Sequence, residues 1–169
     1  RGDFSVQVSM VKTNAKRLII FEKFSAFHRI VDSKEWNESE IGRSSICVTG
    51  GGYPDLATRE FVSEVCGKCT SIVSIFALVD FDPDGVEILL QYQQSLGERK
   101  VIWKCVRSDQ ISRISEKSKL GMSERDLNKC KSILTRVFEE PFKSEIEWMM
   151  KFGKKVEIES IEWIEILNF

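Results

Sequence analysis

The sequence predicts an α/β fold in which a mostly parallel sheet of about four strands is covered by helices on both faces. Short apolar runs typical of buried strands alternate along the chain with stretches of helical periodicity. The strand runs lead into glycine, proline or acidic residues, which signal a turn into the next helix. A β-α-β-α-β-α-β order of this kind forms a parallel sheet, because parallel strands need a crossover connection between them.

Each element of this sheet has its own signal in the sequence. The strands are runs rich in Val, Ile, Leu and Phe, and the second ends in three glycines before Pro54 opens a helix. The third strand leads through an acidic loop, residues 80–85, into another helix. The expected elements are strand 17–22, helix 23–31, strand 45–49, helix 54–67, strand 74–80, a helix after residue 85 and strand 101–106; residues 4–10 alternate like a further strand.

The segment after the fourth strand is expected to be helical. Ser123 is an N-cap signal, and apolar residues recur at helical spacing after it. We therefore divide the chain into a core, residues 1–120, and a C-terminal helical extension, residues 121–169, packed on it within one compact domain. The expected helices of the extension cover 123–134, 144–151 and 156–167.

The composition excludes several classes of protein, and the near-zero net charge conceals an uneven distribution of charge along the chain. With 42% hydrophobic and 30% charged residues the chain is neither disordered nor collagen-like, and no apolar run approaches the roughly 18 residues of a membrane span, so no membrane partner is expected. The single histidine, His28, excludes any site that needs two imidazoles. The net charge of −1 is made up of −4 over residues 1–98, +7 over 99–136 and −4 over 137–169. The basic middle segment makes an anionic partner plausible.

Acidic residues follow two of the predicted strands at the edge where such sheets bind ligands. Glu22 ends the first strand, and Asp80 and Asp82 end the third. These carboxylates meet at one edge of the sheet and repel one another unless they are protonated or bridged by a cation. Oxygen ligands suit Mg²⁺, with Mn²⁺ as its substitute, and Mg²⁺ keeps positions open for phosphate oxygens. The pattern therefore predicts a site for phosphate binding or phosphodiester chemistry.

Other motifs near these positions have alternative interpretations. The glycines at 50–52 let a phosphate approach the backbone, but they equally form a tight strand-to-helix turn, and Tyr53 after them either touches a base or sugar or packs locally. Residues 80–85 resemble a calcium loop, but position twelve is Gln91 and a proline lies inside the loop. The Cys-x-x-Cys pair at 66–69 lacks further zinc ligands, so buried thiols are expected.

Several motifs resemble one protein family. Glu22 at the end of one strand, with Asp80-x-Asp82 at the end of another, is the pattern of the Toprim domain. Longer stretches resemble the subfamily that comprises the topoisomerase VI A protein and its eukaryotic relative, the meiotic DNA double-strand-break protein. This resemblance covers nearly the whole chain. The matching stretches are Asn14-Ala15-Lys16, Phe21-Glu22-Lys23, Phe27-His28-Arg29, Val48 to Arg59, Leu78 to Ile88, Met122 to Asp126, Ser132-Ile133-Leu134 and Lys154 to Ile158.

The resemblance implies an activity and a set of partners. In the family, two protomers pair, the acidic residues bind Mg²⁺ that holds a DNA phosphate, and a tyrosine from the partner's winged-helix domain attacks that phosphate to break both strands. Carried over, Glu22, Asp80 and Asp82 bind the metal, and Glu22 is alternatively a proton-transfer group. The implied partners are double-stranded DNA, a second copy paired through the Toprim domain, and a topoisomerase VI B-like protein or meiotic accessory proteins in the nucleus. The expected DNA contacts are Lys23, Gly51, Gly52, Tyr53, Arg99, Lys100, Lys104 and Arg107.

Departures from the family pattern leave alternatives open. The chain begins with Arg1 and lacks the winged-helix domain with its tyrosine, so we expect a fragment that is inactive alone. Gly51 stands where relatives usually carry Lys, and Asp84 stands where an aromatic residue or His is usual, so Asp84 either approaches the ion through water or faces solvent. A eukaryotic meiotic member is favoured. The alternatives are a non-catalytic dimerisation and DNA-docking module, an archaeal-type topoisomerase VI A protein, and a Toprim nuclease or primase-like enzyme.

Overall fold

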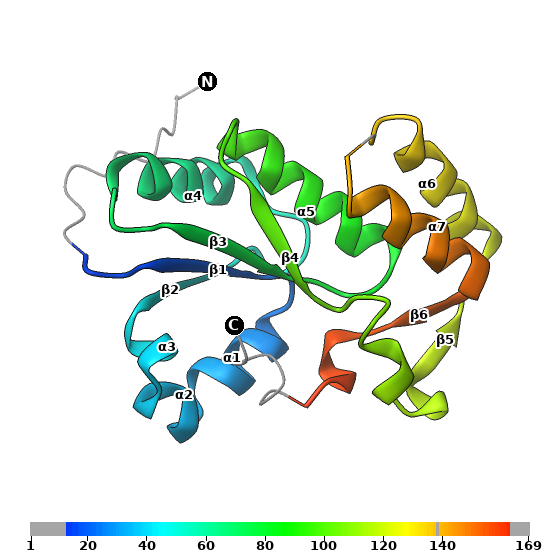
Figure 1. The fold of residues 1–169 in the computed structure, drawn as a ribbon, viewed down its shortest axis with the longest axis horizontal. Helices are drawn as coiled ribbons and strands as arrows, with labels where there is room; N and C mark the ends of the chain where they lie inside the picture. The colour runs from blue at the N-terminus through cyan, green and yellow to red at the C-terminus, as the bar shows by residue number, and fades with distance from the viewer. Residues whose placement is uncertain (1–12, 138, 163–169) are drawn as a thin grey trace.

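The structure, a computed structural model, describes residues 13–137 and 139–162 and confirms the predicted α/β fold. Its main sheet has four parallel strands in the order β2-β1-β3-β4 (Figure 1). The strand bounds agree with the predicted ones to within two residues. The strands are β1 (Arg17–Phe21), β2 (Ser45–Thr49), β3 (Ser74–Leu78) and β4 (Val101–Cys105).

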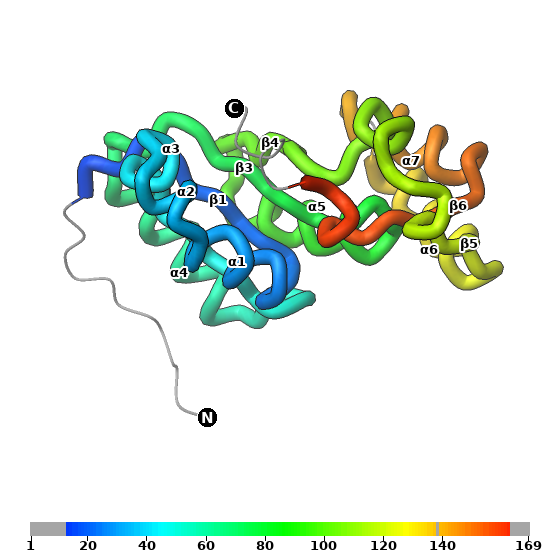
Figure 2. The backbone as a smooth tube through the Cα atoms, turned by 90° about the horizontal axis from the view of Figure 1, so that it is seen from below, coloured from blue at the N-terminus to red at the C-terminus, as the bar shows by residue number. Residues whose placement is uncertain are grey.

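Helices cover both faces of the sheet. The three helices between β1 and β2 lie below it in Figure 1, and the helices that follow β2 and β3 lie above it. Figure 2, seen from below, has the first group in front of the strands. The lower helices are α1 (Phe24–Val31), α2 (Lys34–Glu38) and α3 (Glu40–Arg43), of which only α1 was predicted; the upper helices are α4 (Leu56–Lys68) and α5 (Pro83–Leu96).

The central strand β1 sets the position of the site. Its residues from Leu18 to Phe21 are fully buried because helices cover both faces, which explains their continuous apolar run. Phe21 pairs with both Thr49 and Leu78, so β1, β2 and β3 end level with one another. The residues that follow these strands therefore emerge at one edge. All five cysteines are free and four of them are buried, as expected.

A small sheet that was not predicted joins the end of the core to the C-terminal extension. Helices α6 (Glu124–Leu134) and α7 (Phe142–Phe152) agree with two predicted helices, and β5 (Lys119–Gly121) pairs antiparallel with β6 (Lys154–Val156). The helix expected at 156–167 is wrong over the part described, where Ile158–Ser160 is a single 3-10 turn. The backbone N–H and C=O of Val156 bond to those of Phe81, at 3.2 and 2.8 Å, and so are not available to a helix. Residues 163–167, and the strand expected at 4–10, lie outside the described residues.

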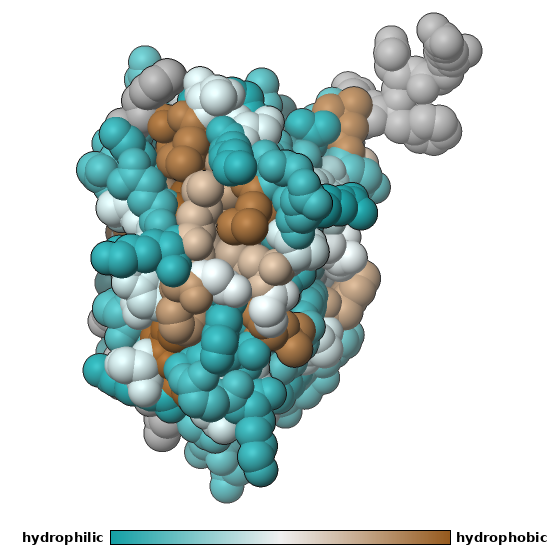
Figure 3. Space-filling view, turned by 90° about the vertical axis from the view of Figure 1, so that its right-hand side faces the viewer, coloured by the Kyte–Doolittle hydropathy of each residue, from teal (hydrophilic) through white to brown (hydrophobic). Residues whose placement is uncertain are grey.

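The end of the molecule that carries α6 and α7 is largely hydrophilic, with hydrophobic side chains grouped in its middle (Figure 3).

Helix α6 begins with a capping box, in which the Ser123 hydroxyl accepts from the Asp126 N–H and the Asp126 carboxylate accepts from the Ser123 N–H. Within the described residues, no helix has the length and apolar character needed to cross a membrane.

Candidate functional site

Glu22 stands immediately after β1, at the edge where the parallel strands end. Its backbone N–H donates to the carbonyl of Leu78 at 3.0 Å, and its own carbonyl accepts from the Gly52 N–H at 2.6 Å. Its carboxylate oxygen Oε2 accepts from the Asp80 N–H at 2.8 Å. The side chain is buried. Glu22 is therefore held by backbone and side chain between β3 and the glycine loop.

Asp80 follows β3, is buried and uses both carboxylate oxygens. Oδ1 accepts from the backbone N–H of Ile158 at 2.9 Å, and Oδ2 forms an ion pair with Lys23 Nζ at 2.8 Å. Lys23 Nζ lies 3.2 Å from the carboxylate of Glu159 as well. Because Ile158 and Glu159 belong to the C-terminal extension, this extension is in direct contact with the site.

Asp82 is the N-cap of α5, where its Oδ1 accepts from the Gly85 N–H at 2.7 Å. Pro83 takes the first helical position, where a missing N–H costs nothing. A side chain at Gly85 would begin 2.5 Å from the Asp80 carbonyl oxygen and 3.2 Å from Glu22 Oε2. Only glycine allows the start of α5 to approach both Asp80 and Glu22 this closely.

Burial and the charges of neighbouring carboxylates raise the pKa values of these three carboxyl groups. Burial, followed by the charge of Asp80, raises the pKa of Glu22 to about 8. Burial also raises the pKa of Asp80, against the opposing hydrogen bond and charge of Lys23. It raises the pKa of Asp82 too, against the hydrogen bond from Gly85. The ionised forms are thus unfavourable here unless a cation compensates them.

The three carboxylates have the chemistry that Mg²⁺ prefers, but they are not arranged as a finished metal site. All the donors are oxygens, which suits a hard divalent cation. Among residues 13–137 and 139–162, no three His, Cys, Asp or Glu side chains cluster closely enough to hold a metal ion. The ammonium of Lys23 already lies against Asp80, so this position accepts a cation. The donors are therefore of the kind that suits Mg²⁺, and Lys23 supplies the cation beside Asp80 in this structure.

The glycine loop, residues 50–52, lies at the same edge of the sheet. Gly51 and Gly52 have φ values of 65° and 116°, conformations that favour glycine. A side chain at Gly51 would overlap the ring of Phe24 at the start of α1, whereas nothing lies within 4 Å of a side chain begun at Gly52. The loop therefore has the Phe24 ring against one glycine and open space beside the next.

Asp84 bonds to two neighbours from distant parts of the chain. Its Oδ1 accepts from the hydroxyl of Tyr53 at 2.7 Å and lies 2.6 Å from Nζ of Lys129 on α6. Lys129 also donates to the Tyr53 hydroxyl, and its Nζ lies 5.1 Å from the centre of the Tyr53 ring. Although burial opposes it, the bonds from Lys129 and Tyr53 lower the pKa of Asp84. Asp84 thus connects the tyrosine after the glycine loop to the C-terminal extension.

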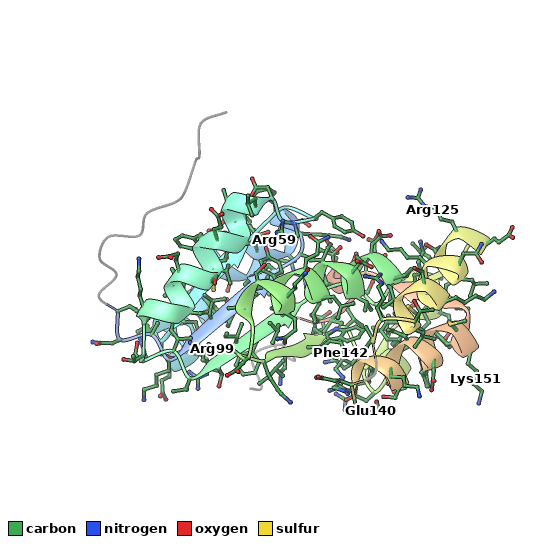
Figure 4. The ribbon with its side chains drawn as sticks, turned by 90° about the horizontal axis from the view of Figure 1, so that it is seen from above. Arg59, Arg99, Arg125, Glu140, Phe142 and Lys151 are labelled. Atoms are coloured by element: carbon green, nitrogen blue, oxygen red, sulfur yellow. The ribbon has the colours of Figure 1, made fainter. Side chains whose placement is uncertain are left out.

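Two of the predicted DNA contacts, Arg99 and Lys100, precede β4 and lie at the opposite edge of the sheet from the carboxylates. Arg99 donates through its two terminal nitrogens to the backbone carbonyls of Cys66 and Ile72, both at 2.5 Å. Figure 4 shows Arg99 near one end of the molecule and Arg125 of α6 near the other. The structure does not bring this pair to the candidate site.

The other two basic candidates lie on or directly after β4. Lys104 is a half-buried residue of the strand, and Arg107 follows its carboxyl end. Arg107 forms an ion pair at 3.0 Å with Glu145, a buried residue of α7. Lys100 and Arg107 both line a groove of about 810 Å³ between α5, β4 and the start of α7. This groove lies beside the sheet, apart from the three carboxylates.

Sequence reasoning missed three residues that contact the site. Lys129 bonds to Asp84 and Tyr53, which lie 45 and 76 positions earlier in the sequence, and no local sequence pattern predicts such a contact. Glu159 bonds to Lys23 and was placed within a predicted helix. Phe24 had a usable signal, since it follows Glu22 by two positions and therefore lies close to the strand end. The contacts of Lys129 and Glu159 depend on how separate segments pack.

Comparison with known proteins gives one consistent result. Residues 17–168 match the profile of the TOP6A-Spo11 family, described as the Toprim domain of the topoisomerase 6 A protein and Spo11. The meiotic recombination protein SPO11-2 of Arabidopsis thaliana is 30% identical over 163 residues, 90% of this chain and 41% of the relative. SPO11 of Mus musculus is 31% identical over 88% of this chain and 40% of the relative, and the A3 protein of DNA topoisomerase 6 from Oryza sativa subsp. indica is 28% identical over 92% and 37%. The chain thus spans about two fifths of the length of these relatives.

Proposed function

The chain belongs to the TOP6A-Spo11 Toprim family, and from this premise we propose that it is the Mg²⁺- and DNA-binding domain of a protein that makes meiotic double-strand breaks. One observation carries the proposal. Glu22, Asp80 and Asp82 all follow strand ends at the carboxyl edge of the sheet and have raised pKa values, and a lysine ammonium already compensates Asp80. A site of this kind favours a divalent cation and, through it, a phosphate.

The protein's own residues have distinct roles in this proposal. Glu22, Asp80 and Asp82 hold Mg²⁺, which supplies positive charge to a DNA phosphate. Alternatively, Glu22, whose pKa is raised to about 8 in the absence of a metal ion, holds or releases a proton near neutral pH. Lys23 exchanges Asp80 for the phosphate when the metal binds. The glycine loop lets the DNA backbone approach closely.

The attacking tyrosine belongs, in this proposal, to a part of the protein outside these 169 residues. Tyr92 is fully buried, and the hydroxyl of Tyr53 is bonded to Asp84 and Lys129. The external tyrosine oxygen forms a bond to phosphorus while the bond from phosphorus to the DNA 3′ oxygen breaks, and the phenolic proton ends on that 3′ oxygen. The same proposal includes pairing with a second copy, a topoisomerase VI B-like protein or meiotic accessory proteins, and a nuclear location.

Metal binding by variants of Asp80 tests the site. We expect Mg²⁺, titrated by calorimetry, to bind the wild-type chain and to bind at least tenfold more weakly to Asp80→Asn, which keeps the hydrogen bond from Ile158 but loses the charge. Asp109→Asn is the matched control, since Asp109 is exposed in the turn after β4. Equal Mg²⁺ affinity of wild type and Asp80→Asn contradicts the assignment.

A non-catalytic DNA-docking module is the second candidate, and one observation favours it. Lys23 is bonded to Asp80 and Glu159 together, so the position of one cation is filled by the protein itself. If Lys23 is a permanent replacement for a metal, the wild-type chain does not bind Mg²⁺ at this site. If Lys23 only competes with the metal, Lys23→Met raises the Mg²⁺ affinity, and calorimetry separates the two candidates.

A further inference from the structure

A short segment of the C-terminal extension, residues 157–161, runs across the candidate site, and we call it the C-terminal strap. The chain is held on both sides of this crossing. Val156, directly before the strap, pairs its backbone with that of Phe81, after β3. Arg29 of α1 donates to two backbone carbonyls of the strap, at 3.0 and 2.7 Å. The strap, drawn in red, therefore lies beside α1 (Figure 2), and it connects the segment after β3 to the helix after β1.

The two carboxylate oxygens of Asp80 have partners of different kinds. Oδ1 accepts from the backbone N–H of Ile158, a buried residue of the strap, at 2.9 Å. Oδ2 lies 2.8 Å from Nζ of Lys23. The N–H of Ile158 cannot leave without moving the strap, whereas a lysine ammonium moves by rotation about the bonds of its flexible side chain. Oδ2 is therefore the oxygen of Asp80 that can be freed for another cation.

The ammonium of Lys23 has acidic partners on the strap as well as on Asp80. Among the described residues, the carboxylates that contact it are those of Asp80, of Glu159 at 3.2 Å and of Glu157 at 3.8 Å. The other oxygen of Glu159, Oε1, accepts from the hydroxyl of Ser25 on α1 at 2.5 Å. This bond holds Glu159 with its Oε2 toward the ammonium. Lys23 therefore keeps two negative partners within 4 Å when it leaves Asp80.

We propose that Glu159 is a positioning residue for Lys23, which retains the ammonium when a divalent cation takes Oδ2 of Asp80 and before a DNA phosphate is bound. Without such a partner, the ammonium would lose its contact with Asp80 uncompensated and would be repelled by the entering cation. Glu159 lowers this cost, so the C-terminal strap contributes to the cation affinity of the site without being a ligand. The inference rests on the proposed function, because it requires a cation at Asp80.

Mg²⁺ titrations by calorimetry, in chains with and without Lys23, test this role. Glu159→Gln keeps an oxygen for the Ser25 hydroxyl and loses only the charge. We expect it to bind Mg²⁺ about three- to fivefold more weakly than wild type, the upper range for a partly exposed ion pair. In the Lys23→Met background the same substitution is expected to change the affinity by less than about 1.5-fold, because no ammonium then needs a partner. Glu162→Gln is the matched control, since Glu162 directly follows the strap, is exposed and carries the same charge.

The outcomes separate this inference from the proposed function. If Mg²⁺ binding is lost in Asp80→Asn but Glu159→Gln binds Mg²⁺ as tightly as Glu162→Gln, the inference is overturned and the proposed function stands. An equal loss from Glu159→Gln with and without Lys23 also overturns it, because the strap then acts through its fold or its charge and not through Lys23. If only Lys23→Met binds Mg²⁺, Lys23 does not release Asp80 and the inference is wrong. If neither the wild-type chain nor Lys23→Met binds Mg²⁺, the proposed function fails and this inference fails with it.

Discussion

Replacing Glu22 with glutamine is expected to stabilise the fold while it removes metal binding. Glu22 is buried, and its Oε2 accepts a hydrogen bond from the Asp80 N–H. A glutamine carbonyl oxygen accepts the same bond, so the contacts are kept and only the ionisable group is lost. Replacing a glutamate that serves only the structure lowers the stability of the folded chain. A gain in stability therefore indicates a residue that is retained for function.

The magnitude follows from the pKa of Glu22. Folding raises this pKa from 4.5 to about 8, so the folded chain binds an extra proton between these pH values and loses stability as the pH rises through them. At pH 7, about 2.5 units above the ordinary value, the cost is roughly 3 kcal/mol at about 1.4 kcal/mol for each unit. Glu22→Gln removes this cost, and little difference from wild type remains at pH 4.5 and below.

Urea unfolding at pH 5 and pH 8 without Mg²⁺ checks this prediction. We expect Glu22→Gln to be more stable than wild type by a few kcal/mol at pH 8 and by much less at pH 5, and to gain nothing from added Mg²⁺. Glu98→Gln serves as control because Glu98 is exposed, and it is expected to change stability by less than about 0.5 kcal/mol. A Glu22→Gln chain less stable than wild type at pH 8 would refute the reasoning.

Two further substitutions test the geometry around the site. Gly85→Ala places a methyl group 2.5 Å from the Asp80 carbonyl oxygen, so we expect thermal unfolding to show a loss of stability of about 1–3 kcal/mol and Mg²⁺ to bind more weakly. Gly121→Ala is the control, because nothing lies within 4 Å of its added methyl group, and it should leave stability and Mg²⁺ binding nearly unchanged. Equal effects of the two substitutions would contradict the packing argument. Arg99→Met loses hydrogen bonds to two backbone carbonyls, so we expect it to lower stability by about 2–4 kcal/mol without changing the salt dependence of DNA binding. The control Lys100→Met is expected to change stability little. A weaker salt dependence of DNA binding for Arg99→Met would show instead that Arg99 contacts a phosphate.

Much of the fold was predictable because local signals and global packing agree. The apolar run at β1 predicts a strand buried on both faces, and the structure places it at the centre of the sheet. The helix expected at 156–167 failed because Val156 bonds to Phe81, 75 positions earlier, and a short segment follows the partner that its backbone finds. Periodicity carries no information about such a partner.

In the candidate site, too, the placement of some residues was predictable from the sequence and the placement of others was not. That Glu22, Asp80 and Asp82 share one edge follows from their places at strand ends, since parallel strands end together. The basic residues at 99–107 formed one group in the sequence, but β4 runs between them. Arg99 therefore lies at the edge opposite the carboxylates, and Arg107 is paired with Glu145.

The sequence by itself determined the sheet, its carboxyl edge and the acidic residues on it, because each of these depends on neighbours within a few positions. Only the tertiary structure decided which cations and rings meet those acids. Lys23 with Asp80, Lys129 with Asp84 and Phe24 with Gly51 are contacts between separate segments, and they exist because helices and loops from both halves of the chain converge on one edge. The charge and shape of the site therefore depend on tertiary packing, whereas its acidic residues can be identified from the sequence.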